Sequence, residues 1–172
     1  KNSRNRNLID IQKIAKAVEL FTRNNHISVG DTPNDIVCET RLYRLLHYHS
    51  LVNRVSPVPI LVVYALVNRS YILDLQPNKS WIRHLLTQGF DIYLLDWKSP
   101  TRMDKYVSFD DYVNCYIDDC VEIVQNKNSV DKITLHGYCM GSSMSAMYTA
   151  LHQEKIKNLV NIKSILLKKL LV

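Results

Sequence analysis

Apolar runs alternate along this chain with segments of helical periodicity, and this order restricts the fold more than any other feature. Residues 60–65 form a continuous run rich in β-branched residues, as is typical of a strand buried on both faces of a sheet, and further strand-like runs cover residues 90–96, 132–136 and 159–162. Apolar side chains recur three and four residues apart over residues 80–86, 109–124 and 140–152, which predicts helices. The order predicts an α/β fold with a parallel sheet, right-handed crossovers and helices on both faces.

Local signals mark the ends of two of these helices. Ser108 and Asp111 have the spacing of a capping box, which begins the helix over 109–124. Gly89 follows the helix over 80–86 at the position where glycine commonly ends a helix.

The two ends of the chain differ in pattern from the middle. Residues 8–22 have the spacing of an amphipathic helix, a polar stretch over 24–34 follows, and residues 36–48 weakly predict two short strands. Residues 161–172 are rich in Leu, Ile and Lys without turn or cap signals. We therefore divide the chain into an N-terminal helical segment (1–31), a domain (32–160) and a tail (161–172).

Composition excludes several classes of protein. The length of 172 residues fits one domain, and the net charge of +6 is scattered without a basic patch interleaved with aromatics, so we expect no nucleic-acid partner. The longest apolar run, 58–67, is interrupted by Pro59 and is too short to span a bilayer, and no secretory signal is visible. The four cysteines form no C-x-x-C pair, which predicts reduced thiols in the cytoplasm and no metal site.

One short motif carries chemistry. Gly137-Tyr138-Cys139-Met140-Gly141 lies directly after a predicted strand and directly before a predicted helix. This is the context of a nucleophile elbow, with Cys139 in the place of the usual serine and two glycines where side chains would collide with neighbouring backbone. The helix N-terminus stabilises a thiolate at Cys139, and the backbone N–H of Met140 can supply half of an oxyanion hole.

The alternative is a purely structural role, in which the glycines only end a strand and Cys139 is a small buried residue. A cysteine nucleophile also needs a base, and His152 lies thirteen residues further along, roughly 18–20 Å away at the far end of the same helix. His136 is close in sequence, but we expect it to point sideways from its strand. No base and acid pair is identifiable for Cys139.

Two acidic positions have both a functional and a structural interpretation. Asp96, followed by Trp97, ends a strand at the active-site edge, where it either lines a substrate pocket or, as we favour, anchors a loop. Asp118 and Asp119 could form a paired carboxylate site, but the solvated face of a helix is the simpler interpretation.

Several stretches resemble the poly(3-hydroxyalkanoate) synthases, in particular the catalytic subunit of their class III, two-component enzymes. The resemblance spans residues 32–160, and the segments that carry it are Tyr64–Arg69, Tyr71–Pro77, Gly89–Trp97, Asp110–Asn114, Tyr116–Cys120, the Gly137–Gly141 motif and Ser145–His152. The Gly137–Gly141 motif is similar to the lipase-like box of that family, with cysteine as the nucleophile.

The resemblance implies an α/β-hydrolase fold and polymerisation of (R)-3-hydroxyacyl-CoA with release of CoA. Cys139 matches the acylated nucleophile, and the backbone N–H groups of Met140 and of Val67 or Asn68 would line the oxyanion hole. It also implies a second, non-catalytic synthase subunit, a polyester granule surface in the cytoplasm, and no cofactor or metal.

The chain departs from this family in three ways. Ser142 and Ser70 stand where members usually carry glycine and proline. The catalytic Asp and His of the family lie well beyond the motif, in a C-terminal half that we expect to be missing here. Resemblance also fades after Val160, as a frameshift, a premature stop or a fragmentary gene model would produce, and the three downstream reading frames would distinguish these.

An incomplete sheet with an apolar edge predicts poor solubility, and the missing base predicts little or no polymerase activity. Two other functions stay open. One is a truncated, non-catalytic protein that binds the partner subunit or the granule surface, and the other is a thiol-dependent hydrolase of small esters.

Overall fold

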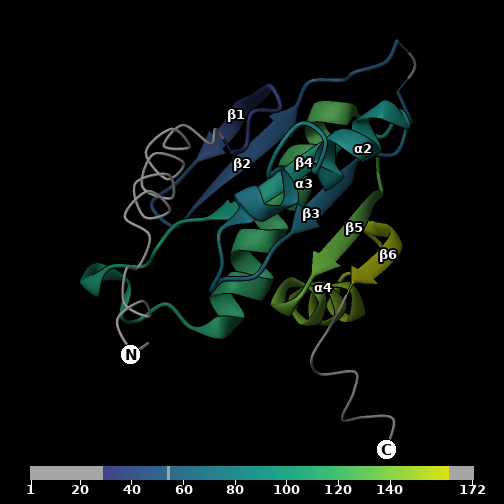
Figure 1. Cartoon of the computed structure of the whole chain (residues 1–172). Helices are drawn as coiled ribbons and strands as arrows, with labels where there is room; N and C mark the ends of the chain where they lie inside the picture. Colours follow the sequence, from purple (N-terminus) through teal and green to yellow (C-terminus); the bar gives the residue numbers. More distant parts are fainter. Residues whose placement is uncertain (1–28, 54, 163–172) are drawn as a thin grey trace, which may run out of the picture.

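The computed structural model describes residues 29–53 and 55–162 (Figure 1). The helix expected over residues 8–22 lies outside these ranges. The strands of the described part are β1 (Asn34–Glu39), β2 (Tyr43–Tyr48), β3 (Ile60–Val63), β4 (Ile92–Trp97), β5 (Ile133–Tyr138) and β6 (Ile156–Ile162). The helices are α2 (Trp81–Thr87), α3 (Ile117–Asn128) and α4 (Met140–Leu151), with short turns η1 (Ser70–Leu73), η2 (Arg102–Asp104) and η3 (Asp111–Tyr116).

The strands of the described residues form one six-stranded sheet in the order β1-β2-β4-β3-β5-β6. Strands β4, β3, β5 and β6 are parallel, as expected, but β2 runs antiparallel to both β1 and β4. Strands β1 and β2, which the sequence predicts only weakly, thus add antiparallel pairs at one end of the sheet. The reason is the short turn between β1 and β2, where Thr40 N–H donates to Tyr43 O at 2.9 Å, because a turn of this length joins only antiparallel strands.

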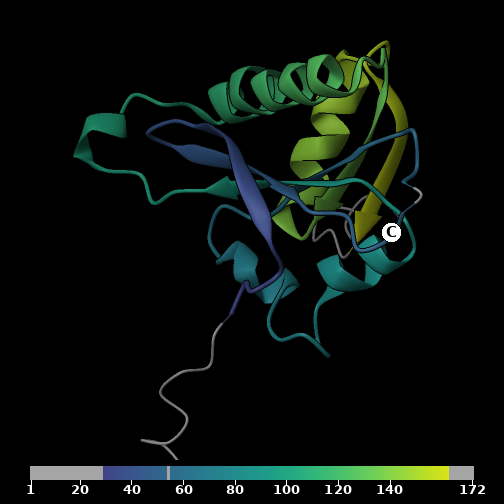
Figure 2. The same ribbon diagram turned by 90° about the horizontal axis from the view of Figure 1, so that it is seen from above.

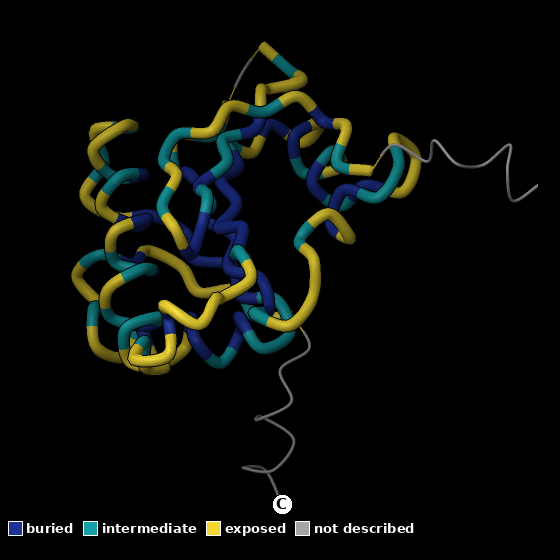
Figure 3. The backbone as a smooth tube through the Cα atoms, turned by 90° about the vertical axis from the view of Figure 1, so that its left-hand side faces the viewer, coloured by how far each residue is buried: buried dark blue, intermediate teal, exposed yellow. Residues whose placement is uncertain are grey.

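Helices cover both faces of the sheet, as expected. Figure 2 shows α3 on one side of the strands and α2 on the other. Alternate residues of β3 face the two layers: Leu61 and Val63 belong to the core cluster with α3 and α4, whereas Val62 belongs to the cluster with α2. Figure 3 shows the buried residues gathered in the interior of the molecule, and the two core clusters lie on opposite faces of the sheet.

The predicted helix signals are present. The Ser80 hydroxyl accepts a hydrogen bond from Arg83 N–H at 2.8 Å at the start of α2, and Gly89 has φ +82° just after its end. Ser108 and Asp111 form the capping box, in which Ser108 N–H donates to Asp111 Oδ2 at 2.7 Å and Asp111 N–H donates to Ser108 Oγ at 3.1 Å. These local signals position α2 and α3 against the two faces of the sheet.

The helix expected without interruption over 109–124 contains a π-helical segment, η3, before α3 begins. Two tyrosines of η3 pack against aromatic residues of the sheet: the ring centroids of Tyr112 and Trp97 are 5.3 Å apart, and those of Tyr116 and Tyr43 are 5.9 Å apart. The widened turn thus lies where the helix meets the most crowded aromatic part of the core.

The helices of residues 29–53 and 55–162 are all too short or too polar to cross a bilayer. Strand β6 continues to Ile162, two residues beyond the expected end of the domain at residue 160.

Candidate active site

Cys139 occupies a sharp turn between β5 and the twelve-residue helix α4. Its backbone has φ 57° and ψ −121°, a positive φ that residues with a side chain rarely adopt. The sharp turn between strand and helix that the motif predicts is therefore present, and its backbone is strained in a way that is typical of functional positions. The side chain is half-buried and packs against the core cluster on the α2 face.

The two glycines of the motif are required by close backbone contacts. A Cβ added to Gly141 would lie 2.0 Å from Val63 O, and one added to Gly137 would lie 2.4 Å from Ser142 Cα. Both distances are far below any van der Waals contact. The glycines therefore allow α4 to approach β3 and β5 closely enough to hold Cys139 at the carboxyl end of the sheet.

Ser142 replaces the expected glycine without disturbing the elbow. The side chain is fully buried, and its hydroxyl lies 2.8 Å from Gly137 O and 3.0 Å from Ile162 O. The serine therefore adds a polar contact between α4, the end of β5 and the end of β6.

Some backbone groups of Cys139 already form hydrogen bonds within the fold. Cys139 N–H donates to Ile162 O at 3.0 Å, and Cys139 O accepts from Ser142 N–H at 3.0 Å. Met140 is the first residue of α4, so its N–H has no partner within the helix and points out of the helix N-terminus. Met140 N–H is therefore a backbone donor beside Cys139 that the helix itself does not use.

The loop after β3 carries the other proposed oxyanion donors. Val67 is 79% exposed, and the Asn68 side chain hydrogen-bonds the Tyr64 hydroxyl. Val67 and Asn68 line a small cavity of about 120 Å³. Cys139 is not part of its wall, so the structure does not bring Cys139 and this loop together around a shared cavity.

No histidine of the described residues serves the Cys139 thiol. His136 points from β5 toward the α2 face, where its ring centroid lies 4.7 Å from that of Trp81 and its Nε2 has no hydrogen-bond partner. Burial lowers the pKa of His136 to about 4, so the imidazole is neutral at physiological pH. His152 follows the far end of α4, stacked on Tyr148 with ring centroids 4.4 Å apart.

Asp96 anchors neighbouring segments of the chain, which is the role that we favoured from the sequence. It is buried, and its carboxylate binds Arg44 of β2 and accepts a hydrogen bond from the Ser70 hydroxyl of η1. Ser70, the second departure from the expected pattern, is therefore part of this anchor. Asp96 also lines a larger cavity, so the two interpretations of this residue are compatible.

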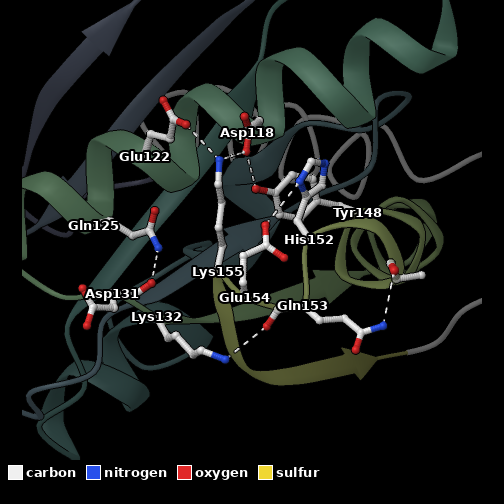
Figure 4. A network of polar contacts seen from close by, with 11 residues as sticks. Asp118, Glu122, Gln125, Asp131, Lys132, Tyr148, His152, Gln153, Glu154 and Lys155 are labelled. Atoms are coloured by element: carbon white, nitrogen blue, oxygen red, sulfur yellow. Dashed lines mark hydrogen bonds and ion pairs between the residues drawn. The ribbon is translucent and has the colours of Figure 1, made fainter.

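Asp118 does not lie on a freely solvated face, contrary to the simpler interpretation of the sequence. Figure 4 shows it between α4 and the residues before β6: Tyr148 OH donates to Asp118 Oδ1, and Lys155 Nζ lies 2.6 Å from the same oxygen. Partial burial alone would raise the pKa of Asp118, but hydrogen bonds from Lys155 and Tyr148 hold it below its ordinary value. The pattern of α3 alone could not reveal these partners, since both come from later elements.

Within the described ranges, no group of three His, Cys, Asp or Glu side chains is arranged to hold a metal ion. The candidate site thus consists of one strained cysteine at a helix N-terminus, a backbone donor beside it and an exposed loop nearby.

The chain matches two family models and several sequences of known proteins. A family model for the α/β hydrolase fold matches residues 58–171, and a model for the N-terminus of poly-beta-hydroxybutyrate polymerase matches residues 8–85. The chain is 54% identical over 135 residues to the poly(3-hydroxyalkanoate) polymerase subunit PhaC of Haloferax mediterranei, covering 78% of this chain and 27% of that protein. It is 40% identical over 151 residues to the protein of the same name from Allochromatium vinosum, covering 87% of this chain and 42% of that protein.

Solved structures share the fold at low sequence identity. A crystal structure from Sulfolobus solfataricus superposes with a TM-score of 0.60 at 15% identity, covering 76% of this chain and 43% of that one. A thermostable carboxyl esterase from Bacillus coagulans superposes with a TM-score of 0.54 at 16% identity, covering 75% of this chain and 43% of that one. At these identities the likeness shows the fold alone.

Proposed function

Because the chain belongs to the α/β-hydrolase fold family and, within it, to the poly(3-hydroxyalkanoate) polymerases, we propose that Cys139 is the nucleophile that forms an acyl-enzyme with (R)-3-hydroxyacyl-CoA. The observation that supports this most directly is the backbone of Cys139, with φ 57° between a buried strand and the N-terminus of α4. A cysteine that merely filled space would not require a strained turn enclosed by two glycines with no room for a Cβ.

The proposed chemistry is acyl transfer in two steps. The Cys139 thiolate attacks the thioester carbonyl, the carbon–sulfur bond to CoA breaks, and CoA leaves as a thiol after taking a proton. The hydroxyl of the growing chain then attacks the acyl-enzyme, forms an ester and returns Cys139 to its thiol form. No cofactor or metal takes part in either step.

Each tetrahedral intermediate carries a negative charge on the former carbonyl oxygen. Met140 N–H, at the N-terminus of α4, would donate a hydrogen bond to this oxygen. Val67 or Asn68 N–H would complete the oxyanion hole from the exposed loop after β3.

The second step needs a base that accepts the proton of the attacking hydroxyl. The described residues place no histidine against Cys139, since His136 lies beneath Trp81 and His152 lies beyond the far end of α4. The catalytic Asp and His would therefore come from residues other than those described. We expect this 172-residue chain by itself to acylate slowly and to polymerise little or not at all.

The relatives are named polymerase subunits, which supports a partner subunit for this chain as well. The proposed setting is the cytoplasm, in a complex with a second synthase subunit at the surface of polyester granules.

Release of CoA from (R)-3-hydroxybutyryl-CoA tests this proposal. The chain is expected to release about one equivalent of CoA and then stop, because acylation proceeds without efficient deacylation. Cys139→Ala should abolish the release, whereas Cys115→Ala, which removes an exposed thiol on η3, should leave it unchanged. Release that survives in Cys139→Ala would refute the nucleophile, and sustained turnover would refute the expected inactivity.

A further inference from the structure

A cavity of about 510 Å³ is lined by residues of β1, β2, β4 and η1, together with residues that directly follow β4. Three basic side chains form part of its wall: Arg44 of β2, Arg69 just before η1, and Lys98 just after β4. Asp96 is the one acidic residue that lines it. The wall therefore has an excess of positive charge, which favours an anionic ligand.

The carboxylate of Asp96, the one acidic group that lines the cavity, already has hydrogen-bond partners. Asp96 Oδ2 accepts from Arg44 Nε at 3.2 Å and from Arg44 Nη2, and Asp96 Oδ1 accepts from the Ser70 hydroxyl. Lys98 Nζ lies 2.6 Å from Glu39 Oε1, at the edge of the same region. A ligand therefore meets no free carboxylate in the cavity wall.

Arg69 differs from the other two cations. Its guanidinium makes no ion pair or hydrogen bond with any residue in 29–53 or 55–162, although Arg44 and Lys98 are both paired. Five N–H donors in a planar group are thus presented at the cavity, and this geometry matches the oxygens of a phosphate.

The rest of the wall is aromatic and apolar. Its aromatic residues are Tyr48, Tyr71 and Trp97, of which Tyr71 is exposed, and its aliphatic residues include Ile36 and Leu46. Such a wall accommodates a flat, weakly polar body next to the cationic groups. Phosphates joined to a purine base combine these two properties in one ligand.

The larger cavity adjoins the small cavity at the loop after β3. Arg69, Trp97, Lys98 and Ser99 also line the small cavity along Val67 and Asn68. The Trp97 indole N–H donates to Tyr64 O at 3.1 Å. The Tyr64 ring in turn stacks on Tyr138, the residue before Cys139, with ring centroids 5.4 Å apart. The shared residues place the two cavities side by side, and the contacts of Tyr64 join Trp97 to the residue before Cys139.

We propose that the larger cavity binds the phosphate-bearing nucleotide end of a CoA thioester, with Arg69 as its main phosphate ligand. The pantetheine arm then follows the small cavity along Val67 and Asn68, and the thioester reaches Cys139. This inference rests on the proposed function, because it assigns a binding site to the substrate of that reaction. Arg69 acts here as a binding residue, remote from the reacting atoms.

Binding of free CoA to the Cys139→Ala chain tests the site apart from the chemistry. Isothermal titration calorimetry at low salt measures the Kd for this chain and for two further variants, after circular dichroism has shown that each is folded. Arg69→Glu removes the unpaired guanidinium, and Lys127→Glu makes the same change of charge at an exposed position on α3. Arg69→Glu is expected to weaken CoA binding about tenfold or more, and Lys127→Glu to change it little.

Three results would overturn the assignment. The first is no CoA binding at millimolar CoA. The second is an equal loss of CoA affinity in Arg69→Glu and Lys127→Glu. The third is an ATP affinity equal to that of CoA, since ATP has phosphates and adenine but no pantetheine arm. Acylation of Cys139 is measured separately with the thioester. If acylation occurs with the same thioester dependence in Arg69→Glu, the binding site is refuted and the proposed function stands. If CoA binds as expected but Cys139 is not acylated, the proposed function fails and the binding site stands.

Discussion

The imidazole of His136 shows how one buried side chain determines the response of the fold to pH. Burial lowers its pKa from 6.5 to about 4, so between these values the unfolded chain binds a proton that the folded chain excludes. Stability is therefore expected to fall by up to about 3 kcal/mol as pH decreases from 7 to 4, and to be unaffected by this group above pH 7.

Urea unfolding followed by circular dichroism across pH 4–7 measures this effect. His136→Leu should lose less stability over that range than the parent chain, because leucine has no proton to bind. His84→Leu, at an exposed position of α2, provides the matched control and should behave like the parent. Parallel loss of stability in the parent and in His136→Leu would contradict the assignment.

A substitution at Gly141 tests whether the elbow requires the close approach of α4 to β3. The Cβ of Gly141→Ala would lie 2.0 Å from Val63 O, which is backbone and cannot move without separating α4 from β3. The free energy of unfolding is expected to fall by at least about 3 kcal/mol. Met147→Ala on the exposed face of α4 should cost much less. Similar urea midpoints for the two variants would show that the close approach is not needed.

At the scale of elements, a polar cluster joins α3, α4 and the start of β6 (Figure 4). Lys155 Nζ lies 2.6 Å from Asp118 Oδ1 and 2.8 Å from Glu122 Oε1, and the Lys155 side chain is only 22% exposed. Lys155→Met keeps the aliphatic stem but leaves Asp118 with Tyr148 as its remaining partner. We expect a loss of about 2 kcal/mol in urea unfolding. Lys157→Met, at an exposed position on β6, should be near neutral, and equal effects would contradict the role of the cluster.

The elements themselves were largely predictable, but their partners were not. The apolar runs predicted β3, β4, β5 and β6, and the glycine spacing predicted the turn at Cys139, because both signals are local. The antiparallel pairing of β2 with β4 and the π-helical η3 depend on tertiary contacts that no single segment encodes. The hydrogen bond of Ser142 to Ile162 O, like those of Asp118, likewise joins residues distant in sequence.

At the scale of the whole molecule, the sheet has an exposed apolar border. Strand β6 pairs with β5, and no strand of the described residues pairs with its other edge, where Val160 is 44% exposed and Leu159 is 37% exposed. An open edge of this composition promotes association between chains. We expect the chain to be poorly soluble and Val160→Lys to increase the fraction of monomer in light scattering.

Leu151→Lys is the control for this effect, because Leu151 is 63% exposed at the end of α4 and lies away from the edge. It should leave association nearly unchanged. If both lysine variants increase the monomer fraction equally, added charge rather than the edge of β6 accounts for the result.

The proposed reaction depends on a covalent bond to Cys139, and intact-mass spectrometry with peptide mapping after incubation with (R)-3-hydroxybutyryl-CoA measures that bond directly. The account predicts one 3-hydroxybutyryl group per chain, located on Cys139 and absent from Cys139→Ala. A folded chain that carries no such group, or one that carries it on Cys115 or another residue, would contradict the assignment of the nucleophile.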